Sequence, residues 1–298
     1  MDKIITIDPA NTTVPQLHGY LISAVAPRPI AFASTVDQDG KVNLSPFSFF
    51  NVFSANPPVM IFSPARRGRD NTTKHTYENI KAVPETVINI VNYPMVEQTS
   101  LASTEYDRGT NEFQKAGFTE VASKKVKPPR VGEAPVSFEC KVDQVIELGN
   151  EGGAGNLIIA RVVLLHIQEK YLSANGGLDT TKLDLVGRMG ANWYCRASDK
   201  ALFEIPKPQA SKGIGVDKLP ASVQNSTVLT GNNLGRLGNA PSLPGAEAIE
   251  KVKALPEVQH LLRQTDPLLK QKELHLLAKK FLEAGETDKA LALLLAES

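Results

Sequence analysis

The sequence predicts a mainly β protein, a closed or partly closed antiparallel barrel with short helices, followed by a helical C-terminal extension. Up to about residue 205, apolar residues alternate with polar ones or form short continuous runs rich in β-branched and aromatic residues. Helical patterns between these runs are few and short, and strands and helices do not alternate regularly. Beyond residue 245 the apolar residues recur with the helical period instead.

Six segments carry the strand pattern, and we expect them to build the barrel. Residues 37–40 read Asp-Gln-Asp-Gly, a turn sequence in which Gly40 can adopt the positive φ that closes a hairpin between the first two segments. The predicted strands are residues 30–36, 41–44, 59–63, 87–91, 136–148 and 157–168.

Two short helices are expected between these strands. Asn71 or Thr72 can cap a helix that runs to about Lys81, because their side chains accept hydrogen bonds from free backbone N–H groups. Residues 95–102 predict a second helix ahead of a loop at residues 103–109. The first domain therefore spans about residues 1–205.

The last third of the chain has a different composition. Residues 206–245 are rich in Pro, Gly, Asn and Ser, which indicates an extended arm over a surface or a linker. Residues 246–298 predict a helical hairpin in which Gly285 ends one helix and Thr287 begins the next. We expect this extension to pack on the barrel or on a dimer partner, with a separate peptide-binding module as the alternative.

Composition limits the functional classes. The chain has 33 Lys and Arg against 32 Asp and Glu, a net charge of +1, so neither nucleic acid nor an anionic membrane is indicated as a partner. Neither a secretory signal nor a long apolar run is apparent, and we expect a cytoplasmic protein. Cys140 and Cys195 are expected to be core thiols, and no metal-ligand spacing is present.

A hydroxyl-rich aromatic segment at residues 45–51 is the strongest candidate for a binding site. Ser45, Ser48 and Asn51 offer hydrogen bonds, and the phenylalanines among them offer stacking surface, a combination that suits the flat, polyfunctional ring of a flavin. Packing of those rings in the core is the alternative. The polar side chains favour a ligand, because buried donors and acceptors must find partners.

A basic segment at residues 64–76 is the candidate for a phosphate site. It holds three arginines, a lysine and several hydroxyls at an expected helix start, where free N–H groups and the helix dipole favour an anion. A solvated basic loop is the alternative reading.

Several motifs resemble the flavin reductase-like proteins with an FMN-binding split barrel. The likeness covers about residues 5–205 and follows the same order along the chain. It rests on residues 28–31 (Arg-Pro-Ile-Ala), Ser34-Thr35, Asp39-Gly40, Asn43, residues 45–51, residues 74–76, Asn79-Ile80, residues 128–130, residues 135–140 and residues 187–190.

The resemblance implies a homodimeric split antiparallel β-barrel with the flavin ring near the subunit interface. It implies FMN as cofactor, with FAD as the alternative, and no catalytic side chain. Ser63, Lys74 and Thr76 would contact the phosphate, with Arg66 and Arg69 behind them, and Trp193 or Tyr194 would form a wall of the pocket. The other cofactor-binding residues it implies are Ser34, Thr35, Ser45, Pro46, Phe47, Ser48, Phe50, Asn51 and Arg188.

The expected activity is transfer of electrons from NAD(P)H through the flavin to an unidentified acceptor. The alternative is a flavoprotein electron carrier, or a flavin-binding protein without efficient NAD(P)H turnover. Two departures from the family pattern bear on this choice: His75 stands where the family usually has Asp, and Asn156 stands where several members have a His near the nicotinamide. A third reading gives the barrel a structural role and the helical tail a partner.

Overall fold

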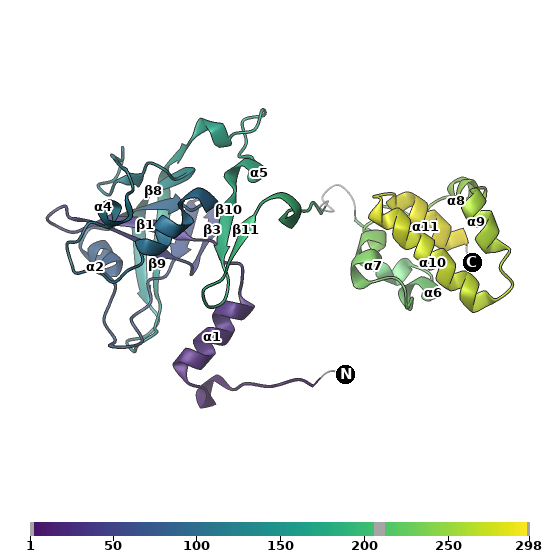
Figure 1. Cartoon of the computed structure of the whole chain (residues 1–298), viewed down its shortest axis with the longest axis horizontal. Helices are drawn as coiled ribbons and strands as arrows, with labels where there is room; N and C mark the ends of the chain where they lie inside the picture. Colours follow the sequence, from purple (N-terminus) through teal and green to yellow (C-terminus); the bar gives the residue numbers. More distant parts are fainter. Residues whose placement is uncertain (1–2, 206–211, 297–298) are drawn as a thin grey trace. The chain divides into compact units, whose positions relative to one another are not determined.

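The computed structural model describes residues 3–205 and 212–296 of the chain. The protein consists of two compact units, Met1–Phe203 and Glu204–Ser298 (Figure 1). Each unit has its own hydrophobic core, so each brings together apolar side chains that are distant in the sequence. Within the described residues, no helix is long and apolar enough to cross a membrane.

The N-terminal unit is built on one seven-stranded sheet in the order β2-β1-β5-β8-β9-β4-β3, with every neighbouring pair antiparallel. The predicted mainly β fold is therefore confirmed. The strands are β1 (Ala31–Val36), β2 (Val42–Phe47), β3 (Phe50–Ala55), β4 (Pro58–Phe62), β5 (Glu85–Ile90), β8 (Val136–Glu147) and β9 (Asn156–Ile167).

The two edge strands of this sheet are consecutive in the sequence. Only Ser48 and Phe49 separate the end of β2 from the start of β3, although these strands lie at opposite ends of the hydrogen-bonding order. The sheet must curl so that its edges meet at this connection, which gives a split barrel. Pro46 fits in β2 because an edge strand can lack one N–H donor.

Strand β1 is buried along its whole length, because apolar clusters cover both of its faces. On one face, Phe32 packs edge-on against Phe118 at 5.3 Å between ring centroids. On the other face, Phe47 packs against Phe62 at 5.5 Å. Alternating side chains of one strand thus contribute to two cores.

Short helices surround the sheet. Helix α2 begins at His75 with Lys74 as its N-cap, two residues later than the nearest predicted cap, Thr72, because Asn71 takes a left-handed conformation with φ 59° and its side chain binds Arg66. Figure 1 shows α1 extending away from the sheet. The helices are α1 (Val14–Ala24), α2 (His75–Ala82), α3 (Val96–Leu101), α4 (Glu112–Ala116) and α5 (Thr180–Leu183).

Two small antiparallel pairs complete the unit. Strands β6 (Glu120–Val121) and β7 (Arg130–Val131) form one pair, and β10 (Leu185–Arg188) and β11 (Tyr194–Ala197) form the other. Arg28 and Arg188 exchange two backbone hydrogen bonds of 2.9 Å, which fix the β10–β11 hairpin to the segment before β1.

The C-terminal unit is a helical domain that begins before residue 246. Residues 206–211 of the expected arm or linker lie outside the described residues, but the rest of residues 206–245 includes two helices. Their apolar side chains Leu219, Val223, Leu229 and Leu237 belong to the same core as Leu274, Leu282 and Leu291. The helices are α6 (Ala221–Gln224), α7 (Gly231–Gly238), α8 (Ala246–Lys253), α9 (Pro256–Leu262), α10 (Pro267–Glu283) and α11 (Thr287–Ala296).

The composition of residues 206–245 suggested an arm or a linker, whereas the described part of this range contains α6 and α7. Composition does not separate the two, because Pro, Gly and Asn also occur at helix starts and caps. The side chain of Thr230 accepts the N–H of Asn233, and Asn233 Oδ1 accepts the N–H of Thr230, which forms a capping box at the start of α7. A few well-placed apolar residues then suffice to bury these short helices.

The predicted helical hairpin at the C-terminus is confirmed as α10 and α11. Gly285 has φ 82° and its N–H donates to Leu282 O, while the N–H of Glu286 donates to Phe281 O. These two bonds close α10 in the pattern for which glycine is preferred.

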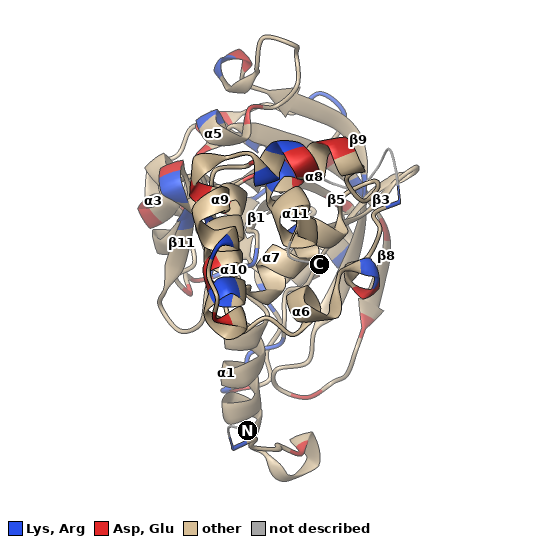
Figure 2. Ribbon diagram, turned by 90° about the vertical axis from the view of Figure 1, so that its right-hand side faces the viewer, with Lys and Arg blue, Asp and Glu red and all other residues tan. Residues whose placement is uncertain are grey.

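Figure 2 shows both signs of charge on α8, where Lys251 pairs with Glu247.

Candidate functional site

A cavity of about 460 Å³ lies in the N-terminal unit where the two edges of the sheet meet. Its walls come from α1, the end of β2, the β2–β3 connection, the loop after β4, the loop after α3 and the end of β10. The lining residues are His18, Ile22, Arg28, Ser45, Pro46, Phe47, Ser48, Phe49, Ser63, Ala65, Arg66, Arg67, Gly68, Arg69, Lys74, Ser103, Glu105 and Arg188.

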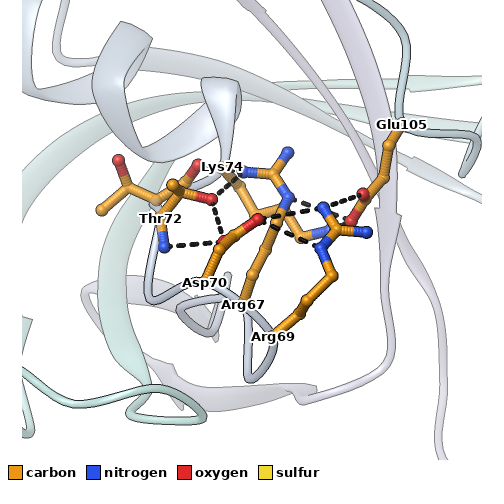
Figure 3. Close-up of polar contacts among 7 residues, drawn as sticks. Arg67, Arg69, Asp70, Thr72, Lys74 and Glu105 are labelled. Atoms are coloured by element: carbon orange, nitrogen blue, oxygen red, sulfur yellow. Dashed lines mark hydrogen bonds and ion pairs between the residues drawn. The ribbon is translucent and has the colours of Figure 1, made fainter.

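One wall of the cavity is strongly basic. Arg67 Nε donates to Glu105 Oε1 at 2.9 Å, Arg69 Nη2 donates to Glu105 Oε2 at 3.0 Å, and Lys74 Nζ lies 3.5 Å from Glu105 Oε1 (Figure 3). The cations come from the loop between β4 and α2, and Glu105 comes from the loop between α3 and α4.

Local hydrogen bonds hold the loop between β4 and α2 in shape. Asp70 accepts the N–H of Thr72 at 3.0 Å and its hydroxyl at 2.6 Å (Figure 3). These bonds, together with Arg69, hold the pKa of Asp70 well below its usual range. Arg66 binds the side chain and the carbonyl of Asn71 at 2.7 and 2.8 Å. The loop therefore presents its remaining cations in a defined arrangement.

His75 follows this loop as the first residue of α2. Burial lowers the pKa of His75, and Arg67, Arg108 and Lys74 lower it further, against the opposing effect of Glu78. The ring is neutral near neutral pH and adds no charge to the basic wall.

Arg28 forms a second polar feature of the cavity. Its side chain donates to the carbonyls of Ile22 and Val25 at the end of α1, to Met189 O at 3.0 Å and through Nε to Ser48 Oγ at 3.3 Å. Burial lowers the pKa of Arg28, and the nearby Arg188 lowers it further. One guanidinium thus connects α1, the β10–β11 turn and the β2–β3 connection.

Aromatic and aliphatic side chains also line the cavity. His18 of α1 meets Phe49 edge-on at 6.2 Å between ring centroids, and Phe47 and Ile22 lie along the same cavity. Arg188 stacks its guanidinium over Tyr194 at 4.6 Å. The cavity thus combines apolar and basic side chains in its lining.

The structure brings most of the predicted site residues together. Nine of them line this cavity although they lie in four separate segments of the sequence. They are Ser45, Pro46, Phe47, Ser48, Ser63, Arg66, Arg69, Lys74 and Arg188.

Three predicted residues are instead buried beside α2 and β1. Ser34 Oγ donates to Pro129 O at 2.5 Å, and Thr35 Oγ1 accepts from Asn79 at 3.1 Å. Thr76 accepts from Asn43 at 2.9 Å and is only 1% exposed. Their hydroxyls do not line the cavity, because burial of β1 on both faces requires them as internal partners.

Three other predicted residues also lie away from the cavity. Phe50 packs against the core around Phe62. Asn51 is exposed on edge strand β3, where its side chain accepts the N–H of Val52 at 2.8 Å. Trp193 is 76% exposed in the turn between β10 and β11. The segment at residues 45–51 is divided between β2 and β3, and this division turns Asn51 outward.

Sequence reasoning missed half of the lining. Arg28 was recognised only as part of a motif, and Glu105 only as part of a loop, because their partners lie far away in the sequence. Arg67 had a signal, since it lies between Arg66 and Arg69 in the same basic segment. The other missed lining residues are His18, Ile22, Phe49, Ala65, Gly68 and Ser103.

The flavin implied by the sequence motifs fits this cavity. The volume is within the range of about 300–1,000 Å³ typical of small-molecule sites. Arg67, Arg69 and Lys74 form a donor set suited to a phosphate. Phe47 and Ser48 supply an apolar face and a hydroxyl for a ring system. Among the described residues, no group of three or more His, Cys, Asp or Glu could hold a metal ion.

Comparison with known proteins places this arrangement in a family. Residues 23–182, more than half of the chain, match the family described as Flavin reductase like domain. An uncharacterized protein of Aquifex aeolicus (strain VF5) is 36% identical over 189 residues, which cover 63% of this chain and 94% of that protein. An uncharacterized protein of Halalkalibacterium halodurans is 36% identical over 208 residues, covering 69% of this chain and 98% of the relative.

Solved structures agree with this assignment. Nitrilotriacetate monooxygenase component B from Bacillus cereus is 27% identical with a TM-score of 0.64, over 69% of this chain and 100% of that chain. A protein with a split barrel domain from Shewanella frigidimarina NCIMB 400 is 26% identical with a TM-score of 0.56, over 66% of this chain and 95% of that chain. The chain described here therefore belongs to the flavin reductase-like family, and its N-terminal unit is a split β-barrel.

Proposed function

We propose that this protein binds FMN in the cavity at the seam of the barrel and acts as an NAD(P)H-dependent flavin oxidoreductase. The observation that carries the proposal is the cluster of Arg67, Arg69 and Lys74 in a cavity that aromatic and aliphatic side chains also line. A phosphorylated, flat, aromatic ligand has the matching distribution of charge and apolar surface.

In this proposal the basic wall binds the phosphate, with Ser63 and Arg66 beside it. The ring lies toward Ser45, Phe47 and Ser48. Arg28 acts indirectly, because it holds Ser48 and the end of α1 in place from a buried position. The proposal assigns no flavin contact to six residues that the resemblance implied, because they do not line this cavity. They are Ser34, Thr35, Phe50, Asn51, Thr76 and Trp193.

The flavin, when bound, supplies the hydride and electron transfer chemistry. The protein then has to bind and orient the ring and exclude water, and no lining side chain has to act as an acid or base. FAD is the alternative cofactor.

The same proposal includes a homodimer, a cytoplasmic location and a separate electron acceptor. The relative from Bacillus cereus supports such an acceptor, since it is by name one component of a monooxygenase.

One observation favours a flavoprotein electron carrier without efficient NAD(P)H turnover as the second candidate. Asn156 stands where several family members have a His near the nicotinamide. Here Asn156 is 1% exposed, and its Nδ2 donates to Pro64 O at 2.9 Å. A side chain used in this way supports the loop after β4 and has no open face for a nicotinamide.

An anaerobic absorbance titration tests the proposal. The purified protein is mixed with FMN, NADH is added, and NADPH is added to a second sample. We expect FMN to bind and its oxidised absorption bands to bleach with one of the two donors. Bound FMN that stays oxidised with both donors would support the electron carrier, and failure to bind either FMN or FAD would contradict both candidates.

A further inference from the structure

The carboxylate of Glu105 occupies the centre of the basic wall. Both of its oxygens are used: Oε1 lies 2.9 Å from Arg67 Nε and 3.5 Å from Lys74 Nζ, and Oε2 lies 3.0 Å from Arg69 Nη2 (Figure 3). These are the donors that the proposed function assigns to the flavin phosphate. Glu105 therefore pairs with these three cations as an anionic ligand would.

Glu105 is ionised in this position. The hydrogen bond from Arg67 lowers its pKa, and Arg69 and Lys74 lower it further, against the opposing effect of burial. Its side chain remains 42% exposed. Arg69 and Lys74 are partly exposed too, at 73% and 31%, whereas Arg67 is the more buried partner at 15%. Exposed ion pairs are weak, so a ligand with a higher charge can replace the carboxylate.

The contacts of Glu105 also join two separate parts of the chain. Glu105 lies in the loop between α3 and α4, 31 to 38 residues away from its three cationic partners. Within its own loop, Tyr106 N–H donates to Thr104 O at 2.9 Å, which does not involve the carboxylate. The side chain can leave the cations without breaking that turn.

We propose that Glu105 is a displaceable internal anion, which holds the Arg67, Arg69 and Lys74 cluster until the phosphate of the flavin replaces it. This inference rests on the proposed function and adds a determinant of ligand choice. A phosphate monoester carries about −1.5 to −2 charges at neutral pH and has three acceptor oxygens, against one charge and two oxygens for Glu105. The exchange therefore favours the binding of FMN. Riboflavin lacks a phosphate, so it gains no affinity from the cluster.

The test compares FMN and riboflavin binding to the full-length protein and to Glu105→Gln. The substitution keeps the size of the side chain and removes its charge, so the phosphate no longer has a competitor. We expect the Kd for FMN to fall about fivefold, the effect of one exposed ion pair. The Kd for riboflavin should change by less than about twofold, because riboflavin does not use the cluster.

Glu147→Gln is the matched control. Glu147 is exposed, accepts a hydrogen bond from Tyr77 and pairs with Lys81 at 3.2 Å, and it does not line the cavity. This variant changes the net charge of the protein by the same amount. We expect no change in FMN affinity. Glu105→Asp is the second control: it restores the charge and should return the FMN affinity toward that of the wild type.

Each outcome decides the inference. Equal FMN affinity of wild type and Glu105→Gln, with both proteins folded by circular dichroism, overturns it and leaves the proposed function standing. An equal gain for riboflavin overturns it as well, because the substitution would then only widen the cavity. An equal gain in Glu147→Gln shows a long-range charge effect and overturns it. If no variant binds FMN, the proposed function fails and the inference fails with it.

Discussion

Arg28 Nε donates to Ser48 Oγ at 3.3 Å, and this contact links the segment before β1 to the connection between the two edge strands. The same guanidinium binds Val25 O at 2.8 Å and Met189 O at 3.0 Å, and Arg28 is only 6% exposed. Three segments that surround the cavity thus depend on one planar group with several donors.

Arg28→Lys tests this dependence. A lysine keeps the positive charge but cannot reach three acceptors at once, so buried carbonyls lose their partners. We expect the free energy of unfolding to fall by about 2 kcal/mol. Urea unfolding measures this change. Arg161→Lys is the control, since Arg161 forms an exposed pair with Asp143 and should leave the free energy of unfolding nearly unchanged. Equal effects of the two substitutions would contradict the assignment.

Lys74→Ala and Thr76→Ala separate binding from stability. Lys74 belongs to the basic wall and is partly exposed, so its loss should weaken FMN binding about fivefold with little effect on unfolding. Thr76 is buried and bonded to Asn43, so its loss should cost about 1–2 kcal/mol of stability and leave FMN affinity unchanged. FMN titration and urea unfolding of both variants check the prediction. The reverse pattern would place Thr76 at the phosphate.

The Glu139 carboxylate predicts a pH-dependent contribution to stability. Burial raises the pKa of Glu139, but hydrogen bonds from the N–H groups of Lys124 and Lys125 and from His166 lower it more, so the net pKa lies below its usual value. A carboxyl with a lowered folded-state pKa stabilises the fold above its unfolded-state pKa and loses this effect as pH falls through the folded-state value.

We therefore expect Glu139→Gln to lower the free energy of unfolding by about 1–3 kcal/mol at neutral pH. The amide would also place N–H donors opposite backbone N–H groups. The difference from wild type should shrink as the pH falls below the ordinary Glu value of about 4.3 and through the lowered pKa of Glu139, where the carboxyl takes up a proton. Urea unfolding across this range gives the result. A difference that stays constant with pH would argue against an ionised Glu139.

Cys140 should resist thiol reagents in the folded protein. Its side chain is fully buried in β8, and burial raises the pKa of Cys140 to about 12, with a further contribution from Glu139. Reaction requires the thiolate and access to solvent. In Cys195→Ser we expect no labelling by a disulfide reagent under native conditions and one label after denaturation. Native labelling of this variant would show that β8 is accessible.

Truncation tests the boundary between the two units. Residues 1–203 contain the whole seven-stranded sheet and the cavity, so this fragment should fold and bind FMN as the full chain does. Residues 1–245 keep α6 and α7 but lose α10 and α11, which leaves Val223 and Leu237 without their core partners. Hydrogen exchange should find residues 212–245 unprotected in the longer fragment. Protection there would contradict a shared core.

The sequence determined the features that depend on local patterns. Alternating apolar residues and short continuous apolar runs predicted six strands of the sheet, and all six exist, because both patterns are local properties of a strand. Gly285 takes the positive φ expected at the end of a helix. The basic segment at residues 64–76 also contributes to a wall of the cavity, since its cations are neighbours in the chain.

Strand β3 and the helices of residues 212–245 escaped this approach. Strand β3 has exposed apolar residues on an edge, so Val52 and Phe53 do not follow an inward and outward alternation. The register of β3 against β4 also shifts between Val52 and Ser54, which disrupts the pattern further. The caps of α6 and α7 use the residue types that are also common in linkers. Packing in the shared core determines that these residues form helices and not a linker.

Only the tertiary structure decided which side chains face the cavity. Ser34 and Thr35 carry the hydroxyls a binding site needs, yet the burial of β1 on both faces makes them internal partners. Arg28 and Glu105 acquire their roles through contacts with Ser48 and Arg67, which lie 20 and 38 residues away in the sequence. Such contacts form only when the sheet curls and brings its edges together, and a local pattern does not encode that closure.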